Sequence, residues 1–387
     1  MLKSMLNRTI RRAVVSTTCA LAALVPIGRS HRPLPIKQPI KHVFVIVLEN
    51  ESFDTSFGDS SPAPYLADTL TKAGAFLRQY HGIGHSSLDN YIAMISGIAP
   101  DPATQGECGR YEELKETGTA PDGQPIGSGC IYPAHVQTIA NQLTARHLTW
   151  KAYMEDMGND PAREASTCGH PVIGESDMTE RATATDQYAA KHDPFMYFHS
   201  VIDSASCRKN VVPLTGLEAD LRSASRTPNF AFIAPSLCHD GHDRPCRNGE
   251  PGGLVSANEF LAHWVPLTTH SPAFRDGGLL IVTFDEAMSA DASACCNEPT
   301  GPNTTLPGTH GLGGGRTGAV LLSRFIKPGT VSDVPYNHYS MLRSIEDIFG
   351  LKHLGYAGQR GLASFGADVY GSKRVNSNRQ HASPSAM

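Results

Sequence analysis

The sequence carries little charge, no internal repeat and no apolar segment long enough to span a bilayer. Only 18% of its 387 residues are charged, and acidic residues outnumber basic residues by 37 to 33. Nine cysteines occur, but no two of them form the C-x-x-C spacing of many zinc sites. These absences argue against a repeat protein, an integral membrane protein, a cysteine-based zinc fold and a basic surface for nucleic acids.

Residues 1–30 have the pattern of a signal peptide. Basic residues, among them Arg11 and Arg12, precede a mostly apolar stretch at 13–28 that is too short and too interrupted for a stable anchor. The adjacent arginines leave a twin-arginine signal open, but the residues that follow fit a general secretory signal better, and the cleavage site stays open. We therefore expect a secreted, periplasmic or cell-surface protein without a nucleic-acid partner. Its oligomeric state is left open.

Export would leave an acidic protein with an even number of cysteines. Removing residues 1–30 takes away five Lys+Arg, no Asp+Glu and Cys19, so the charge balance becomes 28 − 37 = −9 and eight cysteines remain. In an oxidising compartment these form disulfides, and close spacing favours Cys108 with Cys130 and Cys238 with Cys246. Because a bond between the adjacent Cys295 and Cys296 would strain the backbone, we expect two separate partners for them.

Apolar runs without polar alternation predict strands that are covered on both faces, and the first of them fits a buried parallel strand. These runs span residues 42–48, 229–235, 277–284 and 318–323, and apolar residues recur at helical spacing in 135–146, 258–265 and 338–349. The alternation predicts an α/β fold: a doubly wound, mostly parallel central sheet with helices on both faces. Long Gly-, Pro- and Cys-rich stretches at 100–132, 160–190 and 286–316 are expected to lie as loops over the C-terminal edge of the strands. Residues 31–370 then form a single domain, and 371–387 form a disordered tail.

Polar side chains follow directly after these strands, where ligands bind in such sheets. Glu49 and Asn50 end one run, Asp285 and Glu286 end another, and Asp240 and His242 lie in a loop after a third. Carboxylate and amide oxygens are suitable ligands for one or two divalent cations. Each pair could instead be a solvated turn, but the joint placement favours a metal site.

A helix predicted from residue 87 begins with a hydroxyl. Leu88, Tyr91 and Ile92 lie on its apolar face, Gly97 ends it, and Ser87 stands at its start. Ser87 could simply cap the helix, but the same position offers free N–H groups and partial positive charge to a phosphate or an alkoxide. A nucleophilic role would require a neighbouring base or a metal ion.

Other polar residues could contact a phosphoryl group. His310 precedes glycines that permit close backbone approach, and Arg316 could make a bidentate contact. For His85, a role within the fold and a role in chemistry are equally open.

Several motifs together resemble one known family. "KHVFVIVLENESFDTSFG", "HSSLDNYIAMISG", "PSLCHDGHD", "IVTFDEA" and "NHYSMLRSIEDIFGL" occur in the order found in the bacterial phosphoesterases, which include phosphatidylcholine-type phospholipases C and certain acid phosphatases. That family belongs to the alkaline phosphatase superfamily, and the resemblance extends from about residue 40 to about residue 355.

The resemblance implies a role for each matching residue. It implies Ser87 as nucleophile with His85, Asn90 and His242 as catalytic partners, and Asp240 as a phosphate- or substrate-binding residue beside His310 and Arg316. The metal ligands that it implies are Glu49, Asn50, Asp285 and Glu286. This chain departs from the family pattern at Ser86 and Asp89, where the family has prolines, and at His239, where the family has asparagine.

The function expected from these residues is metal-dependent hydrolysis of phosphoric esters through a phosphoserine. The metal could be Ca, Zn, Mg or Mn. A sulfatase is disfavoured because "SSLDNY" lacks the required Pro and Arg, and another esterase or a degenerate binding protein remains an alternative. The substrate could be a small molecule or a lipid, and the polar loops favour small or soluble phosphoesters.

Overall fold

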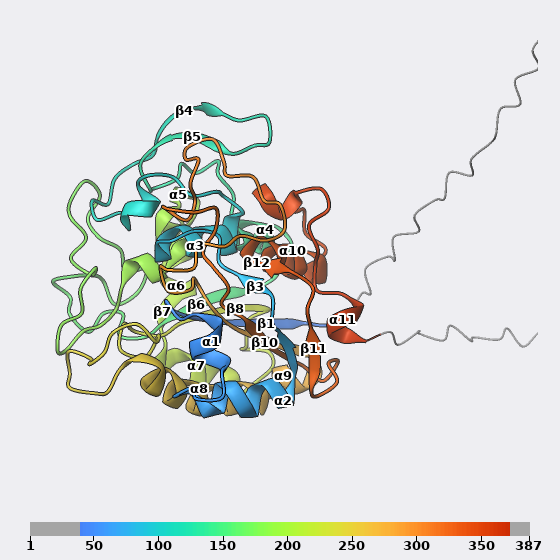
Figure 1. The fold of residues 1–387 in the computed structure, drawn as a ribbon. Helices are drawn as coiled ribbons and strands as arrows, with labels where there is room; N and C mark the ends of the chain where they lie inside the picture. Colours follow the sequence, from blue (N-terminus) through green and yellow to red (C-terminus); the bar gives the residue numbers. More distant parts are fainter. Residues whose placement is uncertain (1–38, 372–387) are drawn as a thin grey trace, which may run out of the picture. The chain divides into compact units, whose positions relative to one another are not determined.

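A computed structural model describes residues 39–371 of the chain (Figure 1). The predicted signal peptide at 1–30 lies outside these residues, as does the predicted tail at 371–387 apart from Gly371.

An eight-stranded sheet forms the centre of the described part, with the strand order β11-β2-β10-β9-β1-β8-β6-β7 (Figure 1). The strands are β1 (His42–Leu48), β2 (Ala75–Leu77), β6 (Trp150–Met154), β7 (Val211–Pro213), β8 (Phe230–Ala234), β9 (Gly278–Phe284), β10 (Ala319–Leu322) and β11 (Thr330–Ser332). The five strands from β9 to β7 are mutually parallel, whereas β10 runs antiparallel to β9 and β2. The prediction of a mostly parallel α/β sheet is confirmed.

Helices cover both faces of the sheet because β1 is apolar on both sides. Val43, Val45 and Val47 pack into one hydrophobic cluster with residues of α3 and α10. The intervening Phe44 and Ile46 pack into a second cluster with residues of α7, α8 and α9. Alternate side chains of a strand point to opposite faces, so an uninterrupted apolar run places helices on both. Figure 1 shows α3 and α10 on one side of the strands and α7, α8 and α9 on the other.

Longer helices agree with the sequence better than shorter elements do. The helices are α1 (Phe53–Phe57), α2 (Thr71–Ala73), α3 (Ser87–Ser96), α4 (Ile139–Ala145), α5 (His199–Ile202), α6 (Cys207–Asn210), α7 (Thr215–Leu221), α8 (Gly253–Thr269), α9 (Pro272–Gly277), α10 (His338–Phe349) and α11 (Ala367–Tyr370). The helix predicted at 338–349 is confirmed, that at 135–146 begins only after its capping residue Thr138, and that at 258–265 is part of the longer α8.

Short turns of other helix types and two small sheets complete the described part. The helical turns are η1 (Tyr65–Leu70), η2 (Thr104–Gly106), η3 (Ala190–His192), η4 (Pro194–Tyr197) and η5 (Gly355–Gly358). The small sheets pair β3 (Tyr80–His81) with β12 (Tyr336–Asn337), and β4 (Lys115–Thr119) with β5 (Pro125–Ser128). The hairpin β4–β5 lies within the stretch 100–132 that was expected to be a loop.

Four disulfides involve all eight cysteines of the described residues. Cys108–Cys130 and Cys238–Cys246 are confirmed, and Cys168 pairs with Cys207. The expectation of separate partners for Cys295 and Cys296 is wrong, because these two residues bond to each other. Cys296 adopts a positive φ of 69°, a turn of the backbone that the sequence does not reveal.

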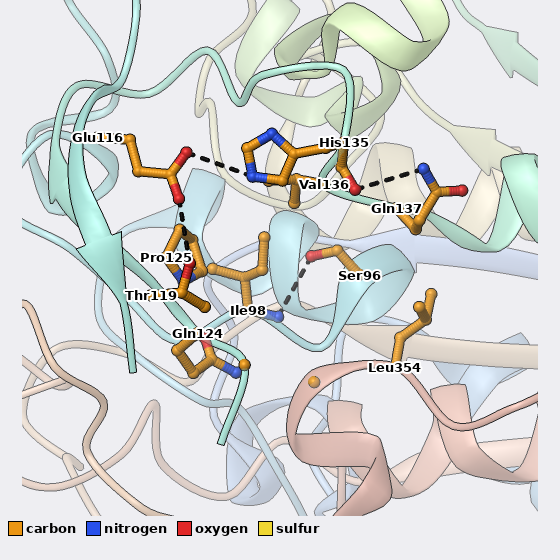
Figure 2. A pocket seen from close by; sticks show the side chains of 12 residues that line it. Ser96, Ile98, Glu116, Thr119, Gln124, Pro125, His135, Val136, Gln137 and Leu354 are labelled. Carbon is orange, nitrogen blue, oxygen red and sulfur yellow. Dashed lines mark hydrogen bonds and ion pairs between the residues drawn. The ribbon is translucent and has the colours of Figure 1, made fainter. Parts of the chain in front are cut away.

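The C-terminal end of α3 is held firmly. Gly97 ends the helix with a φ of 71°, and the Gln124 side chain donates to the Gly97 carbonyl at 3.0 Å and accepts from the Ala99 amide at 2.9 Å. Beside this end lies a cavity of about 220 Å³ under the hairpin β4–β5, where Glu116 and His135 approach to 3.3 Å (Figure 2). The contacts of Gln124 therefore fix the C-terminal end of α3, and Ser87 lies at the opposite end of the helix.

Among the described residues, no helix has both the length and the apolar character that a membrane crossing requires.

The double-sided packing of β1 predicts a large effect of Ile46→Ala. Ile46 is fully buried, so we expect its truncation to lower the free energy of unfolding by about 2–5 kcal/mol, measured by urea denaturation. In the control Val331→Ala, the replaced side chain is 51% exposed and the expected loss is below about 1 kcal/mol. Equal losses in the two variants would contradict the packing described for β1.

Candidate active site

Three neighbouring parallel strands bring carboxylates to one edge of the sheet. Glu49 follows β1 directly, Asp285 follows β9 directly, and Asp240 lies in the loop after β8. The Glu49 amide donates to the Asp240 carbonyl at 2.8 Å, and the Asp285 amide donates to the Leu48 carbonyl at 2.9 Å. All three carboxylates are completely buried. The backbone thus holds Glu49 between two other buried acids.

Each of these carboxylates has one oxygen without a hydrogen-bond partner among the described residues. These oxygens are Oε2 of Glu49, Oδ2 of Asp240 and Oδ2 of Asp285. Burial, together with the charge of Glu49, raises the pKa of Asp240 and of Asp285 well above the ordinary value. A bound cation would keep all three acids ionised, so their arrangement fits a metal ion.

A histidine completes this group. His192, from η3, is buried and places Nε2 2.7 Å from Oε1 of Glu49 and Nδ1 3.6 Å from Oδ2 of Asp240. One ligand atom from each of Glu49, His192 and Asp240 lies within 4.8 Å of the others. The ring of Tyr91, on α3, stacks on the His192 ring with centroids 5.1 Å apart. We call Glu49, His192, Asp240 and Asp285 the acidic cluster.

Helix α3 begins at Ser87, and its Tyr91 contacts His192 of the acidic cluster. Ser87 is 1% exposed, and its amide and that of Leu88 donate to the carboxylate of Glu107. The Asn90 side chain accepts from the Ile83 amide at 2.7 Å and donates to Oε2 of Glu286 at 3.4 Å. Asn90 therefore shapes the turn before the helix and ties it to the residue after Asp285.

Comparison with known proteins agrees with this geometry. The model of the Phosphoesterase family matches residues 63–352. The chain belongs to this family. It is 26% identical over 320 residues to a probable acid phosphatase of Kluyveromyces lactis, covering 81% of this chain and 59% of that protein. It is 24% identical over 337 residues to a phosphatidylinositol-3-phosphatase of Mycobacterium tuberculosis, covering 87% of this chain and 85% of that protein.

Among solved structures, a protein in the alkaline phosphatase superfamily from Vibrio parahaemolyticus matches with a TM-score of 0.46 and 13% identity, covering 81% of this chain and 67% of that one. The chain spans about three fifths of the length of the fungal acid phosphatases that it matches.

In this member of the phosphoesterase family, two of the expected metal ligands have other contacts. Asn50 has a positive φ of 54°, and its amide donates to Oδ1 of Asp285 at 3.0 Å, while its side chain makes no hydrogen bond among the described residues. Glu286 faces Nδ1 of His85 at 3.3 Å, and burial raises the pKa of Glu286 to about 7 although His85 opposes the rise. Glu286 therefore pairs with His85, whereas Glu49 pairs with His192.

His85 connects two loops. Its Nε2–H donates to the Asp291 carbonyl at 2.8 Å, and its ring stacks on the exposed His310 with centroids 5.5 Å apart. Burial lowers the pKa of His85, but Glu286 and the Asp291 contacts outweigh this effect and raise it. Since both ring nitrogens are engaged, the geometry favours a positioning role for His85.

The two histidines in the loop after β8 have different contacts. Asp243, 3.1 Å from Nδ1 of His242, raises the pKa of His242 to about 9, and the His242 amide donates to Oδ1 of Asp240 at 2.9 Å. His239, by contrast, lies 2.9 Å from both Glu155 and Glu250. His242 thus adjoins the acidic cluster, and His239 is held by two other acids.

Arg316 points elsewhere. Its guanidinium donates to Asp54 at 3.0 Å, lies 4.1 Å from the centre of the Phe53 ring and lines a separate cavity of about 570 Å³ with Arg78. These contacts do not bring Arg316 to Ser87, and the expectation of a phosphoryl contact gains no support from them. Its guanidinium packs on the aromatic ring of α1 instead of extending toward α3.

Two departures from the family pattern occupy the start of α3. The Ser86 hydroxyl donates to the Gln105 carbonyl at 2.7 Å, which ties the helix start to the following loop. Asp89 is buried without a hydrogen-bond partner, and burial raises its pKa well above the ordinary value. Burial thus favours the neutral form of Asp89 at the start of α3.

Sequence reasoning missed His192, Lys191, Glu107 and the role of His338. The first three lie in irregular segments without a preceding strand or helical pattern, so no periodicity marked them. His338, at the start of α10, donates through Nε2–H to the Asp285 carbonyl and accepts from the Tyr80 hydroxyl at 3.0 Å. Burial lowers the pKa of His338 to about 4. A neutral His338 therefore holds the backbone of Asp285 in place.

This contact predicts a pH-dependent contribution to stability. The ordinary pKa of histidine is about 6.5, so between pH 6.5 and pH 4 the unfolded chain binds a proton that the folded chain does not. Stability is lost as the pH falls through this window, by about 3 kcal/mol in total for a group shifted this far. In His338→Gln this part of the loss should be absent, as measured by urea denaturation at several pH values with chelator present. Parallel pH profiles in both proteins would contradict the assignment.

Proposed function

We propose that the chain hydrolyses phosphoric esters and that Ser87 is the nucleophile. The observation that carries the proposal is the position of Ser87 at the start of α3, the helix whose Tyr91 stacks on His192 of the acidic cluster. Membership of the phosphoesterase family and similarity to acid phosphatases support the reaction class.

A divalent ion would be held by Glu49, His192, Asp240 and Asp285. This set keeps two of the residues expected from the sequence, while Asn50 and Glu286 remain predicted ligands without a contact that tests them. An imidazole among carboxylates favours Zn or Mn over Ca or Mg, which prefer oxygen ligands alone. When bound, such an ion supplies Lewis acidity that lowers the pKa of a nearby hydroxyl and neutralises developing charge.

The chain's own groups then account for the steps. The Ser87 hydroxyl loses its proton to solvent, and its Oγ attacks phosphorus while the bond to the departing alcohol breaks, so that a phosphoserine forms. The alcohol takes a proton from His242, whose raised pKa suits a proton donor. Attack by water then breaks the bond between phosphorus and Ser87 Oγ, releases phosphate and leaves a proton on Ser87, while His242 regains its proton from solvent. Asn90 keeps the helix start aligned with Glu286 throughout.

The disulfides are consistent with the predicted export of the chain. Four disulfides among the described residues are suited to an oxidising compartment, which supports a secreted or periplasmic protein.

A lipid phosphoester is a second candidate substrate class. Large apolar side chains are exposed on two of the long loops: Val172, Ile173, Met178, Met288, Leu306 and Leu312. Such residues could contact acyl chains, and one relative is a phosphatidylinositol-3-phosphatase. A parallel assay of a phosphomonoester, a phosphodiester and phosphatidylcholine, with and without chelator, distinguishes the classes.

Ser87→Ala should lower kcat by at least about 1,000-fold, because it removes the hydroxyl on which the covalent intermediate forms. The matched control Ser225→Ala changes an exposed serine beyond α7 and should retain full activity. Hydrolysis is measured on the substrate that the wild-type protein cleaves best. Substantial turnover by purified Ser87→Ala would rule out the phosphoserine route.

Metal content should depend on His192 and not on His239. His192→Ala removes a buried ligand, so we expect the variant to retain less than about a tenth of the wild-type metal after dialysis, measured by elemental analysis. His239→Ala is the control, because the His239 ring is held by Glu155 and Glu250. Equal metal content in the two variants would show that the ligand set is wrong.

A further inference from the structure

The N-terminus of α3 is capped by a distant carboxylate and not by its own N-cap residue. The Ser86 side chain makes no capping hydrogen bond. Instead, Oε1 and Oε2 of Glu107 accept from the amides of Ser87 and Leu88 at 2.9 and 3.0 Å. Glu107 reaches this place from the turn after η2, where its φ is 56°. A carboxylate thus binds the two amides next to the proposed nucleophile, one through each oxygen.

A lysine completes the surroundings of this carboxylate. Nζ of Lys191 lies 3.5 Å from Oε1 of Glu107, and Lys191 directly precedes the His192 of the acidic cluster. Lys191 therefore links the carboxylate that caps α3 to the segment that carries His192 of the acidic cluster.

Ser87 cannot meet a substrate in this arrangement. It is 1% exposed, whereas the side chain of Glu107 is 23% exposed and that of Lys191 is 15% exposed. Any ester that reaches the Ser87 hydroxyl must first displace a neighbouring side chain. Glu107 is bonded to the Ser87 amide itself and is partly open to solvent, unlike the fully buried acids Glu49, Asp240 and Asp285.

We propose that Glu107 is an exchangeable internal anion, which occupies the position of two phosphoryl oxygens at the start of α3 until a phosphoryl group replaces it. Lys191 then pairs with the incoming phosphoryl group in place of Glu107. Two N–H donors and an ammonium group are the contacts that phosphate oxygens require, and a carboxylate uses the same donors. The inference rests on the proposed function. It adds Glu107 as a group that competes with phosphate and Lys191 as a cation that binds phosphate.

A purely structural role for Glu107 makes different predictions. If Glu107 only caps α3, neutralising it should loosen the helix start and weaken phosphate binding. If it competes with phosphate, Glu107→Gln removes the competing charge while the amide oxygen can still accept from the helix. Phosphate should then bind more tightly even where the helix is slightly less stable.

The test is calorimetric titration of inorganic phosphate into the full exported chain, with Ser87→Ala as the background so that no covalent intermediate forms. We expect Glu107→Gln to lower the Kd for phosphate about tenfold and Lys191→Gln to raise it about tenfold, as one charge-assisted contact would. Glu218→Gln, which removes an exposed acid on α7, is the charge-matched control and should leave the Kd unchanged.

The double variant distinguishes the two roles of Lys191. If Lys191 contacts phosphate, Lys191→Gln weakens phosphate binding in the Glu107→Gln background as well. If Lys191 only neutralises Glu107, Lys191→Gln has no effect on phosphate binding in that background. The second result would overturn the proposed role of Lys191 as a phosphate-binding cation. Unchanged or weaker phosphate binding by Glu107→Gln, with thermal unfolding showing a folded protein, overturns the exchange itself. Absence of ester hydrolysis by the wild-type chain would instead overturn the proposed function, and it is measured separately.

Discussion

Buried negative charge at one edge of the sheet is the constraint on which the site depends. Glu49, Asp240 and Asp285 are carried there by strands whose apolar side chains pack on both faces, so the acids cannot retreat to solvent without breaking the core. Burial of several unpaired carboxylates is strongly unfavourable unless positive charge is supplied. His192 and a bound cation would meet this requirement, so metal binding and folding stability are expected to be coupled.

The second element of the site is the rigidity of α3. Its C-terminal end is fixed by Gly97 and Gln124, its middle by packing of Tyr91 against His192, and its start by the Asn90 side chain, which accepts from the Ile83 amide. A helix held at both ends positions a nucleophile within narrow limits, which is how a fixed geometry lowers the barrier to attack. His338 extends the same principle to Asp285, because a buried neutral imidazole holds the backbone of that residue.

The sequence predicts the parts of this arrangement that have a regular pattern. β1 and β9 are long apolar runs, and α10 has an amphipathic repeat between the cap Asn337 and Gly350, so their boundaries are readable. The three-residue strands β2, β7 and β11 are too short to show any period. Ser87 and the acids directly after strands follow from the motif, whereas His192 comes from an irregular segment that only the folded chain brings to Glu49. The adjacency of Cys295 and Cys296 in the sequence argues for separate partners. The six other cysteines of the described residues pair among themselves, so Cys295 and Cys296 bond to each other.

The acids of the site differ in burial, and this difference distinguishes those that stay in place from the one proposed to exchange with phosphate. Glu49, Asp240 and Asp285 are fully buried and have unsatisfied oxygens, as expected of groups that bind a cation and stay in place. Glu107 is partly exposed, lies on a loop and has every contact that a phosphoryl group would take over. An incoming phosphoryl group that added its charge to all of these acids would be repelled. If Glu107 leaves as the phosphoryl group arrives, one anion replaces another. The local negative charge then rises far less than it would if Glu107 stayed in place.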